Sequence, residues 1–358
     1  MNSLLLPYQK NGFNLKNHIV MAPMTRSRAL NNIPNDLMAE YYGQRTGAGL
    51  IITEGTAPDA NGLGYPRIPG IFSTAQIDGW KKITASVHHG GSKIFLQLMH
   101  TGRIGHTDNL PEGATLVGAS DHTAAGQIFT DTKGMQDHSK PTPLTSEGIQ
   151  SVIEGYVTAA KNAMKAGFDG VELHGANGYL LEQFLNPHVN NRTDEYGGSI
   201  TNRARLTLEV AAKVAAAIGK EKTGIRFSPY STFGDLPPYP EEEVHATYAY
   251  LAAELDKMGV AYIHISANPA IPQKTFDAIR LAYTGTILLC NGLTPATAEA
   301  TLQKGFADLV AFGRAFLANP DLVERMESGA SLNQPDFTTL YTPGAKGYTD
   351  YLTLALTK

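Results

Sequence analysis

The stretch Gly170–Tyr179 reads GVELHGANGY, and together with the segment before it this stretch decides the fold. Its first half is a short, continuous run of mostly apolar residues closed by glycine, as expected of a strand buried on both faces. The preceding segment, Thr145–Gly167, begins with threonine, carries an acidic residue two positions later and ends at glycine. This asymmetry is typical of a helix. A helix followed by a buried strand is the repeating unit of a parallel α/β fold.

Seven further runs have the same character, and helical stretches lie between them. The strand-like runs are His18–Met24, Leu50–Gly55, Lys93–Met99, Thr223–Pro229, Ala261–Ser266, Thr286–Cys290 and Leu309–Gly313. The helical stretches are Thr74–Gly90, Ser199–Gly219, Pro240–Gly259, Gln273–Tyr283 and Pro295–Gly305. Eight strands alternating with helices predict a closed (β/α)₈ barrel. An open doubly wound sheet would need a G-x-G-x-x-G turn after the first strand, and Ala22–Thr25 is not such a turn.

One long interruption breaks the alternation. Residues His100–Pro143, rich in Gly, Thr, Asp and His, separate the third strand from its helix. In a barrel, an insertion after a strand lies on the carboxyl face, where it can form a wall or lid over a site, although an exposed flexible loop is the simpler alternative. We expect residues 1–358 to form a single domain, with the tail after Gly329 folded back over the barrel.

Composition excludes several classes of protein. The chain has 29 Lys+Arg against 33 Asp+Glu, a formal charge of 29 − 33 = −4, and no basic cluster, so we expect neither nucleic acid nor a membrane as partner. No apolar run approaches a bilayer-spanning length, and no signal peptide core is present. The single cysteine, Cys290, rules out an internal disulfide and a cysteine-ligated metal cluster, and favours a cytoplasmic location. The oligomeric state, monomer or homo-oligomer, stays open.

The carboxyl end of the fourth strand carries the densest set of reactive groups. His174, Asn177 and Tyr179 lie within six residues, separated by small residues that let the loop bend sharply. An imidazole and an amide can together hold an oxygen that gains negative charge, and a phenol nearby can supply a proton. A lone histidine at a strand end is more often a packing residue, and the grouping of all three favours catalysis here.

Other strand ends suggest an anionic cofactor. Gln97 and Arg226, at the ends of the third and fifth strands, suit a planar heterocycle with carbonyl and amide edges, although Arg226 could instead pair with Glu54 or Glu172. The seventh and eighth ends, Asn291-Gly292 and Gly313-Arg314, have the glycine turns and cation with which barrels often bind phosphate. Each glycine alone could simply end a strand.

A metal site is not expected. The chain has 11 histidines, but the first strand lacks an H-x-H pair, the eighth ends in Gly-Arg rather than Asp, and no H-E-x-x-H occurs.

With these positions assembled, the chain resembles the Old Yellow Enzyme family of FMN-dependent ene-reductases, near the N-ethylmaleimide and 2-cyclohexenone reductases. The resemblance runs from about Leu4 to Tyr351. Its most specific segments are Met21–Arg28 (MAPMTRSR), Gln97–Gly102 (QLMHTG), Phe168–Arg205, Gly224–Tyr230 and Ala311–Asp321 (AFGRAFLANPD).

The resemblance implies non-covalent FMN and NADPH or NADH as electron donor. The residues at positions matching the family's flavin site are Pro23, Met24, Thr25, Gly55, Gln97, Arg226, Asn291, Gly292, Gly313 and Arg314. It also implies that His174 and Asn177 grip the oxygen of an activated alkene and that Tyr179 is the proton donor. Hydride would pass from the flavin to the alkene in a ping-pong reaction on α,β-unsaturated carbonyl, maleimide or nitro compounds.

The substrate side departs from the family pattern at one position. Met99 stands where close relatives carry tryptophan, which should enlarge or soften the pocket; Tyr65, Phe233 and Tyr341 match other positions that line it. Three other classes of protein can be built on such a barrel. A flavin–iron–sulfur reductase needs more cysteines than the chain has. A metal-dependent hydrolase would contain zinc. A non-catalytic flavin-binding barrel would not need His174, Asn177 and Tyr179 together.

Overall fold

The computed structural model describes residues 3–356, and its centre is a closed barrel of eight parallel strands. The strands are β3 (Ile19–Met21), β4 (Leu50–Ile52), β5 (Lys93–Leu98), β10 (Gly170–Gly175), β11 (Thr223–Phe227), β12 (Tyr262–Ser266), β13 (Thr286–Cys290) and β14 (Leu309–Phe312). They pair in chain order, and β14 pairs with β3 to close the ring. The predicted (β/α)₈ barrel is confirmed, although the first two strands are shorter than the apolar runs that indicated them.

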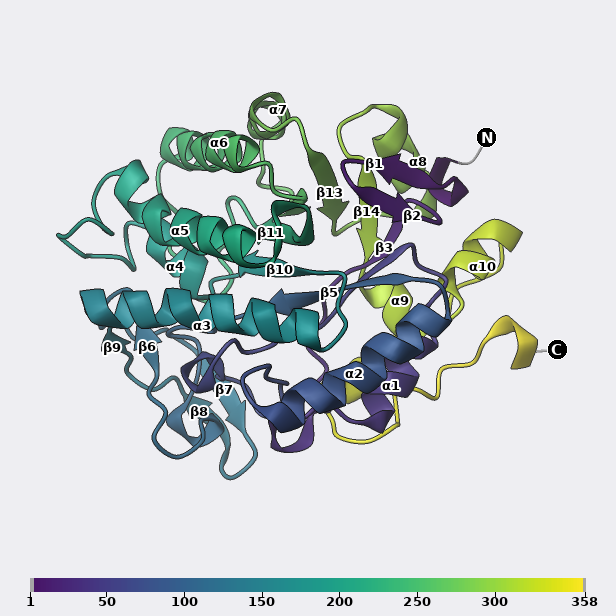
Figure 1. Cartoon of the computed structure of the whole chain (residues 1–358), viewed down its shortest axis with the longest axis horizontal. Helices are drawn as coiled ribbons and strands as arrows, with labels where there is room; N and C mark the ends of the chain where they lie inside the picture. The colour runs from purple at the N-terminus through teal and green to yellow at the C-terminus, as the bar shows by residue number, and fades with distance from the viewer. Residues whose placement is uncertain (1–2, 357–358) are drawn as a thin grey trace.

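Helices surround this barrel (Figure 1). They are α1 (Asp36–Gly43), α2 (Thr74–His89), α3 (Ser146–Lys165), α4 (Leu180–Leu185), α5 (Ile200–Ile218), α6 (Glu241–Met258), α7 (Gln273–Ala282), α8 (Pro295–Gln303), α9 (Arg314–Ala318) and α10 (Leu322–Ser328). The capping residues explain the accuracy of the predicted bounds. Thr145 and Ser199 accept the hydrogen bonds of backbone N–H groups in the first turns of α3 and α5, and Gly259 ends α6 in the left-handed conformation.

The amino end of the barrel is closed by an N-terminal hairpin of β1 (Tyr8–Lys10) and β2 (Phe13–Leu15). The Phe13 ring lies 5.9 Å from Phe95 and 6.0 Å from Tyr262, both of which belong to barrel strands. This aromatic contact fills the barrel from below.

The strand register brings polar side chains together at the other end. Glu172 is opposite Gln97, His174 is opposite Arg226, and Arg226 is opposite His264. Because side chains alternate between the two faces of a strand, these positions share the barrel interior. The interior therefore changes from an apolar base to a polar floor beneath the carboxyl face.

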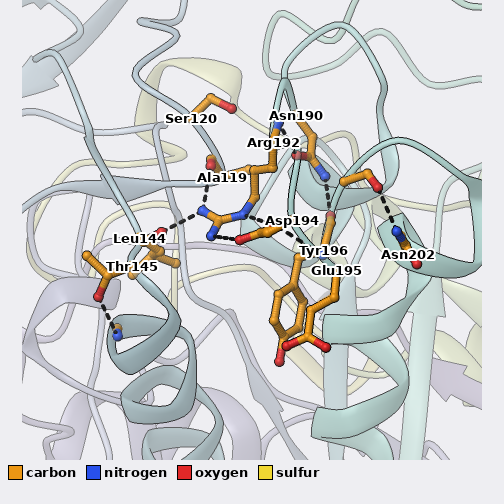
Figure 2. Close-up of polar contacts among 12 residues, drawn as sticks. Ala119, Ser120, Leu144, Thr145, Asn190, Arg192, Asp194, Glu195, Tyr196 and Asn202 are labelled. Atoms are coloured by element: carbon orange, nitrogen blue, oxygen red, sulfur yellow. Dashed lines mark hydrogen bonds and ion pairs between the residues drawn. The ribbon is translucent and has the colours of Figure 1, made fainter.

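The insertion after β5 forms two small sheets, β6 (Val117–Gly118) with β9 (Thr142–Pro143), and the hairpin β7 (Gln127–Thr130) with β8 (Gly134–Asp137). Figure 2 shows how Arg192, from the loop after α4, binds the residues that directly follow β6 and β9. Its guanidinium donates to the carbonyl oxygens of Ala119 and Leu144 and is fixed by Asp194. The insertion is thus anchored at its base.

The C-terminal tail crosses back to the barrel, as the sequence predicted. Tyr348 is fully buried and stacks on Tyr41 with a ring separation of 4.0 Å. Arg26 and Arg28, from the segment after β3, donate to backbone carbonyls of tail residues Gly347 and Leu340. Within residues 3–356, no helix combines the length and apolar character needed to cross a bilayer.

Candidate active site

A cavity of about 870 Å³ lies at the carboxyl ends of the strands. Its wall unites predicted site residues from distant parts of the chain: Pro23, Thr25, Tyr65, Gln97, Met99, His174, Asn177, Tyr179, Arg226, Phe233 and Tyr341. A cavity this large, whose wall combines apolar and aromatic side chains with polar ones, is typical of a cofactor and substrate site.

The other predicted cofactor residues lie around this cavity rather than in its wall. Asn291 lines a second cavity of about 250 Å³ that shares Asn177 and Phe233 with the first. Asn291 and Gly292 both have positive φ and are exposed at the end of β13, beside the end of β14, where Gly313 and Arg314 follow.

Two of the predicted cofactor residues, Gly55 and Met24, pack closely against other predicted site residues. A Cβ at Gly55 would lie 2.4 Å from the Met99 sulfur, so Gly55 makes room for Met99. Met24 packs beside Gly313, where a Cβ would lie 3.5 Å from its sulfur.

His174 is held as a neutral hydrogen-bond donor. Its Nδ1 accepts the backbone N–H of Ala176 at 3.3 Å, so the ring proton belongs on Nε2. Burial, together with the positive charges of Arg226 and His264, lowers the pKa of His174 well below its usual value. An uncharged imidazole with a free N–H can polarise a substrate oxygen without giving up its proton.

Tyr179 is held as a protonated phenol. It is 7% exposed, and its hydroxyl donates to the Tyr65 hydroxyl at 3.2 Å. Burial and the neighbouring Tyr65 raise the pKa of Tyr179 well above its usual value. The rings of Tyr179 and His174 meet edge to face with centroids 4.9 Å apart, so the phenol and the imidazole lie in one small region.

A buried ion pair orients Gln97. The Gln97 amide donates to Glu172 at 2.7 Å, and the other oxygen of Glu172 lies 2.8 Å from His264 Nδ1 and accepts from Tyr262 at 3.0 Å. Burial alone would raise the pKa of Glu172, but His264, Arg226 and Gln97 outweigh it and lower the pKa. The attraction of Glu172 raises the pKa of His264 against its own burial. The pair is therefore ionised, and Gln97 keeps its carbonyl oxygen free for the cavity.

Arg226 has a group available for an anion. One of its terminal nitrogens lies 3.3 Å from Ser266 Oγ and 3.2 Å from Cys290 Sγ, while its Nε is buried without a partner among the described residues. The suggested ion pairs are not found in residues 3–356, since Glu172 pairs with His264 and Glu54 accepts from Tyr42 and the Arg26 N–H. The charges of Glu172 and His264 cancel, so the guanidinium of Arg226 leaves a net positive charge on the floor of the cavity. This arrangement fits the electron-rich pyrimidine edge of FMN.

Three chain segments form the rim of the cavity: residues 65–67, the β7–β8 hairpin and the C-terminal tail. The β7–β8 hairpin contributes Phe129 and Met135, both about half exposed, and the tail contributes Phe337. Arg67 connects these segments: it donates to the carbonyl oxygens of Ser27 and Tyr341 and forms an ion pair with Asp131 of the hairpin turn. The rim is therefore apolar and cross-linked by one arginine.

Two residues that support the cavity wall, His264 and Glu182, were not among the predicted site residues, and Glu172 was considered only as a possible partner of Arg226. Glu172 and His264 were visible as polar residues within continuous apolar strands, at positions that share a face with His174 and Arg226. The hydroxyls of Tyr248 and Tyr262 bind the buried carboxylates Glu182 and Glu172. For Glu182, within the apolar stretch of α4, no local signal was available.

The fold and this site define a barrel oxidoreductase built around a flavin. The chain matches the model of the NADH:flavin oxidoreductase / NADH oxidase family over residues 3–333. It is 42% identical to 12-oxophytodienoate reductase 1 of Oryza sativa subsp. japonica, covering 97% of this chain and 92% of the relative. The structure of morphinone reductase superposes with a TM-score of 0.94 at 42% identity, covering 99% of this chain and 97% of the other, and the same enzyme has been solved with tetrahydroNAD. The Old Yellow Enzyme homologue of Zymomonas mobilis gives 0.93 at 39% identity, covering 98% and 100%.

The chain therefore belongs to the NADH:flavin oxidoreductase family, which includes the Old Yellow Enzymes, and is an FMN-dependent NAD(P)H oxidoreductase. The sequence-based prediction of family, enzyme class and cofactor is confirmed.

Proposed function

We propose that this enzyme reduces the activated C=C bond of α,β-unsaturated carbonyl, maleimide or nitro compounds with NAD(P)H, in a ping-pong cycle. One observation carries the proposal: a neutral imidazole N–H donor and a protonated phenol converge on the same cavity wall, at a ring separation of 4.9 Å. That pairing suits a reaction in which an oxygen becomes negative while a carbon nearby takes up a proton.

Each side chain has a proposed role. His174 Nε2–H and the Asn177 amide bind the substrate oxygen and stabilise the charge that develops there. Tyr179, whose pKa lies well above its usual value, keeps its proton until the α-carbon requires it, and Tyr65 is placed to return one. FMN, when bound, supplies the hydride that it has taken from the nicotinamide coenzyme. Arg226 and Gln97 hold the pyrimidine edge of the cofactor.

The remaining predicted cofactor residues complete this proposal. Pro23, Met24, Thr25 and Gly55 would contact the flavin ring, and Asn291, Gly292, Gly313 and Arg314 would bind the phosphate. The exposed turns at the ends of β13 and β14 support this placement, because a phosphate needs free backbone N–H groups and a cation.

The substrate itself would lie against Met99, Tyr65, Phe233 and Tyr341. The names of the rice and morphinone relatives each denote a carbonyl-bearing substrate, which supports the choice of substrate class. We further propose that residues 1–358 act as one FMN-binding domain, with residues 100–143 as a wall of its site.

The decisive experiment is an anaerobic visible spectrum of the purified protein, first alone, then with NADPH, then with 2-cyclohexenone. We expect oxidised-flavin bands that bleach with NADPH and return with the enone. A yellow protein that NADPH bleaches and that neither 2-cyclohexenone, N-ethylmaleimide nor a nitroalkene reoxidises would refute the proposed substrate class. A colourless protein that fails to take up added FMN would refute the placement of the cofactor.

A further inference from the structure

The turn that carries the proposed catalytic groups has a conformation that needs support. Asn177 has φ +57° and the next residue, Gly178, has φ +77°. Glycine adopts the left-handed region readily, but for asparagine this conformation is unfavourable and persists only where the surroundings hold it. Asn177 belongs to the proposed oxygen-binding pair and Tyr179 follows directly, so the shape of this turn sets the geometry of both.

Two buried side chains hold the turn by its backbone. The Asn177 N–H donates to Ser228 Oγ at 2.8 Å, and the Gly178 N–H donates to Glu182 Oε2 at 2.7 Å. The Ser228 hydroxyl in turn donates to Glu182 Oε1 at 2.8 Å. One carboxyl group therefore supports both N–H groups, one directly and the other through Ser228.

Glu182 has an unusual environment for a carboxyl group. It is 3% exposed, and within residues 3–356 it forms no ion pair; its third donor is the Tyr248 hydroxyl at 2.9 Å. Burying a carboxylate without a cation is costly. Three donors meet two oxygens, an arrangement that the ionised form satisfies completely and an amide cannot, because an amide replaces one acceptor with a donor.

We propose that Glu182 and Ser228 are positioning residues, which fix the turn at 175–179 so that the Asn177 amide and the Tyr179 hydroxyl meet the substrate together. Neither residue lines the main cavity: Ser228 lines the second cavity, and Glu182 lines a separate side cavity of about 230 Å³ with Tyr239 and Tyr248. Glu182 therefore acts through the backbone, without touching substrate or cofactor. The inference rests on the proposed function, because it assigns Asn177 and Tyr179 their roles.

The variants Glu182→Gln and Ser228→Ala test this role, with Ser228→Thr as the conservative rescue. Tyr239→Phe is the matched control, because it alters a hydroxyl of the same side cavity that makes no bond to Glu182. Each protein, loaded with FMN, is titrated with 4-chlorophenol in the oxidised state and followed by its absorbance spectrum. Each is then reduced with dithionite and reoxidised either by 2-cyclohexenone or by dioxygen.

We expect Glu182→Gln and Ser228→Ala to weaken phenol binding and to slow reoxidation by the enone, each by about 10- to 100-fold, because a misplacement of about 1 Å can have an effect of this size. Reoxidation by dioxygen, which needs no oxygen-binding pair, should change less than about twofold. Ser228→Thr should recover most of the loss, and Tyr239→Phe should behave as the parent protein.

Unchanged phenol binding and enone rates in both variants would overturn the proposal. An equal loss in the enone and dioxygen rates would also overturn it, since the residues would then support the fold in general. If the parent protein binds phenol but never reacts with the enone, the proposed substrate class fails, while the phenol titration still tests the turn.

Discussion

The buried carboxyl group of Glu182 makes the stability of this protein depend on pH in a direction opposite to that of an ion-paired carboxylate. Burial raises the pKa of Glu182 from 4.5 to about 7, while the donors Gly178, Ser228 and Tyr248 act in the other direction. The folded protein thus holds this proton more tightly than the unfolded chain. The associated stability is greatest below the unfolded pKa and is lost as the pH rises through the folded pKa.

The size of the effect follows from the same two pKa values. Between about pH 5 and about pH 8.5 the unfolded chain has released this proton almost throughout, whereas folded Glu182 releases it only near pH 7. At 1.36 kcal/mol per pKa unit, the free energy of unfolding should fall by about 2 to 3 kcal/mol from this group. Glu182→Gln has no proton to release, so its stability relative to the parent should rise by that amount across the interval.

Urea unfolding of both proteins at a fixed excess of FMN, at the two pH values, measures this quantity. Comparing the parent with the variant cancels the titration of every other group, including Glu54, whose pKa burial also raises to about 7. Glu154→Gln, which removes an exposed carboxyl group of α3, is the matched control. The reasoning would be refuted if the difference in free energy of unfolding between Glu182→Gln and the parent stayed constant from about pH 5 to about pH 8.5.

Three further predictions concern the site and its support. Tyr179→Phe should slow the reaction with 2-cyclohexenone by about 10²- to 10⁴-fold and leave reduction by NADPH largely intact. Stopped-flow absorbance measures each half-reaction, and an enone rate equal to that of the parent would contradict the role of proton donor. Tyr348→Ala, which removes a fully buried ring stacked on Tyr41, should lower the free energy of unfolding by about 3 to 5 kcal/mol in urea titrations, and a change below about 1 kcal/mol would mean that the tail is not docked there. Burial acts to raise the pKa of Cys290, but Arg226 and His264 outweigh it and lower the pKa to about 7, so the thiol should become a thiolate above that pH. The flavin midpoint potential should therefore fall more steeply with pH in the parent than in Cys290→Ala, and parallel slopes would contradict this.

The barrel could be predicted from the sequence because its signals are local. Strands buried on both faces give continuous apolar runs, and helices of ten residues or more begin and end at characteristic capping residues, as Thr145 and Gly259 illustrate. The elements that were missed are short or lack such signals. Helix α4 has only six residues and no side-chain cap at Tyr179, and the paired strands of the insertion span two to four residues each.

The residues that line the cavity could also be predicted, because the carboxyl ends of barrel strands converge on one face independently of how the helices pack. His174, Arg226 and Gln97 needed only their positions in the strands. The supporting layer could not be predicted in this way. The contact between Glu182 and Ser228 joins α4 to the end of β11, 46 residues apart, and depends on how the helix packs rather than on any sequence pattern.

The two buried carboxylates show why a residue type alone does not define its function in this barrel. Glu172 faces His264 and lies near Arg226, so it stays ionised and the floor of the cavity keeps the positive charge of Arg226 for the cofactor. Glu182 faces only hydroxyl and N–H donors, so it ionises near neutrality, and its charge serves the turn that carries Asn177 and Tyr179. A change of pH from about 6 to about 8 therefore changes the charge of Glu182 and with it the support of the turn. Because Cys290 and Glu54 titrate in the same interval, the effect of Glu182 on turnover is the difference between two pH profiles, with and without Glu182→Gln, both measured in a protein with Cys290 replaced.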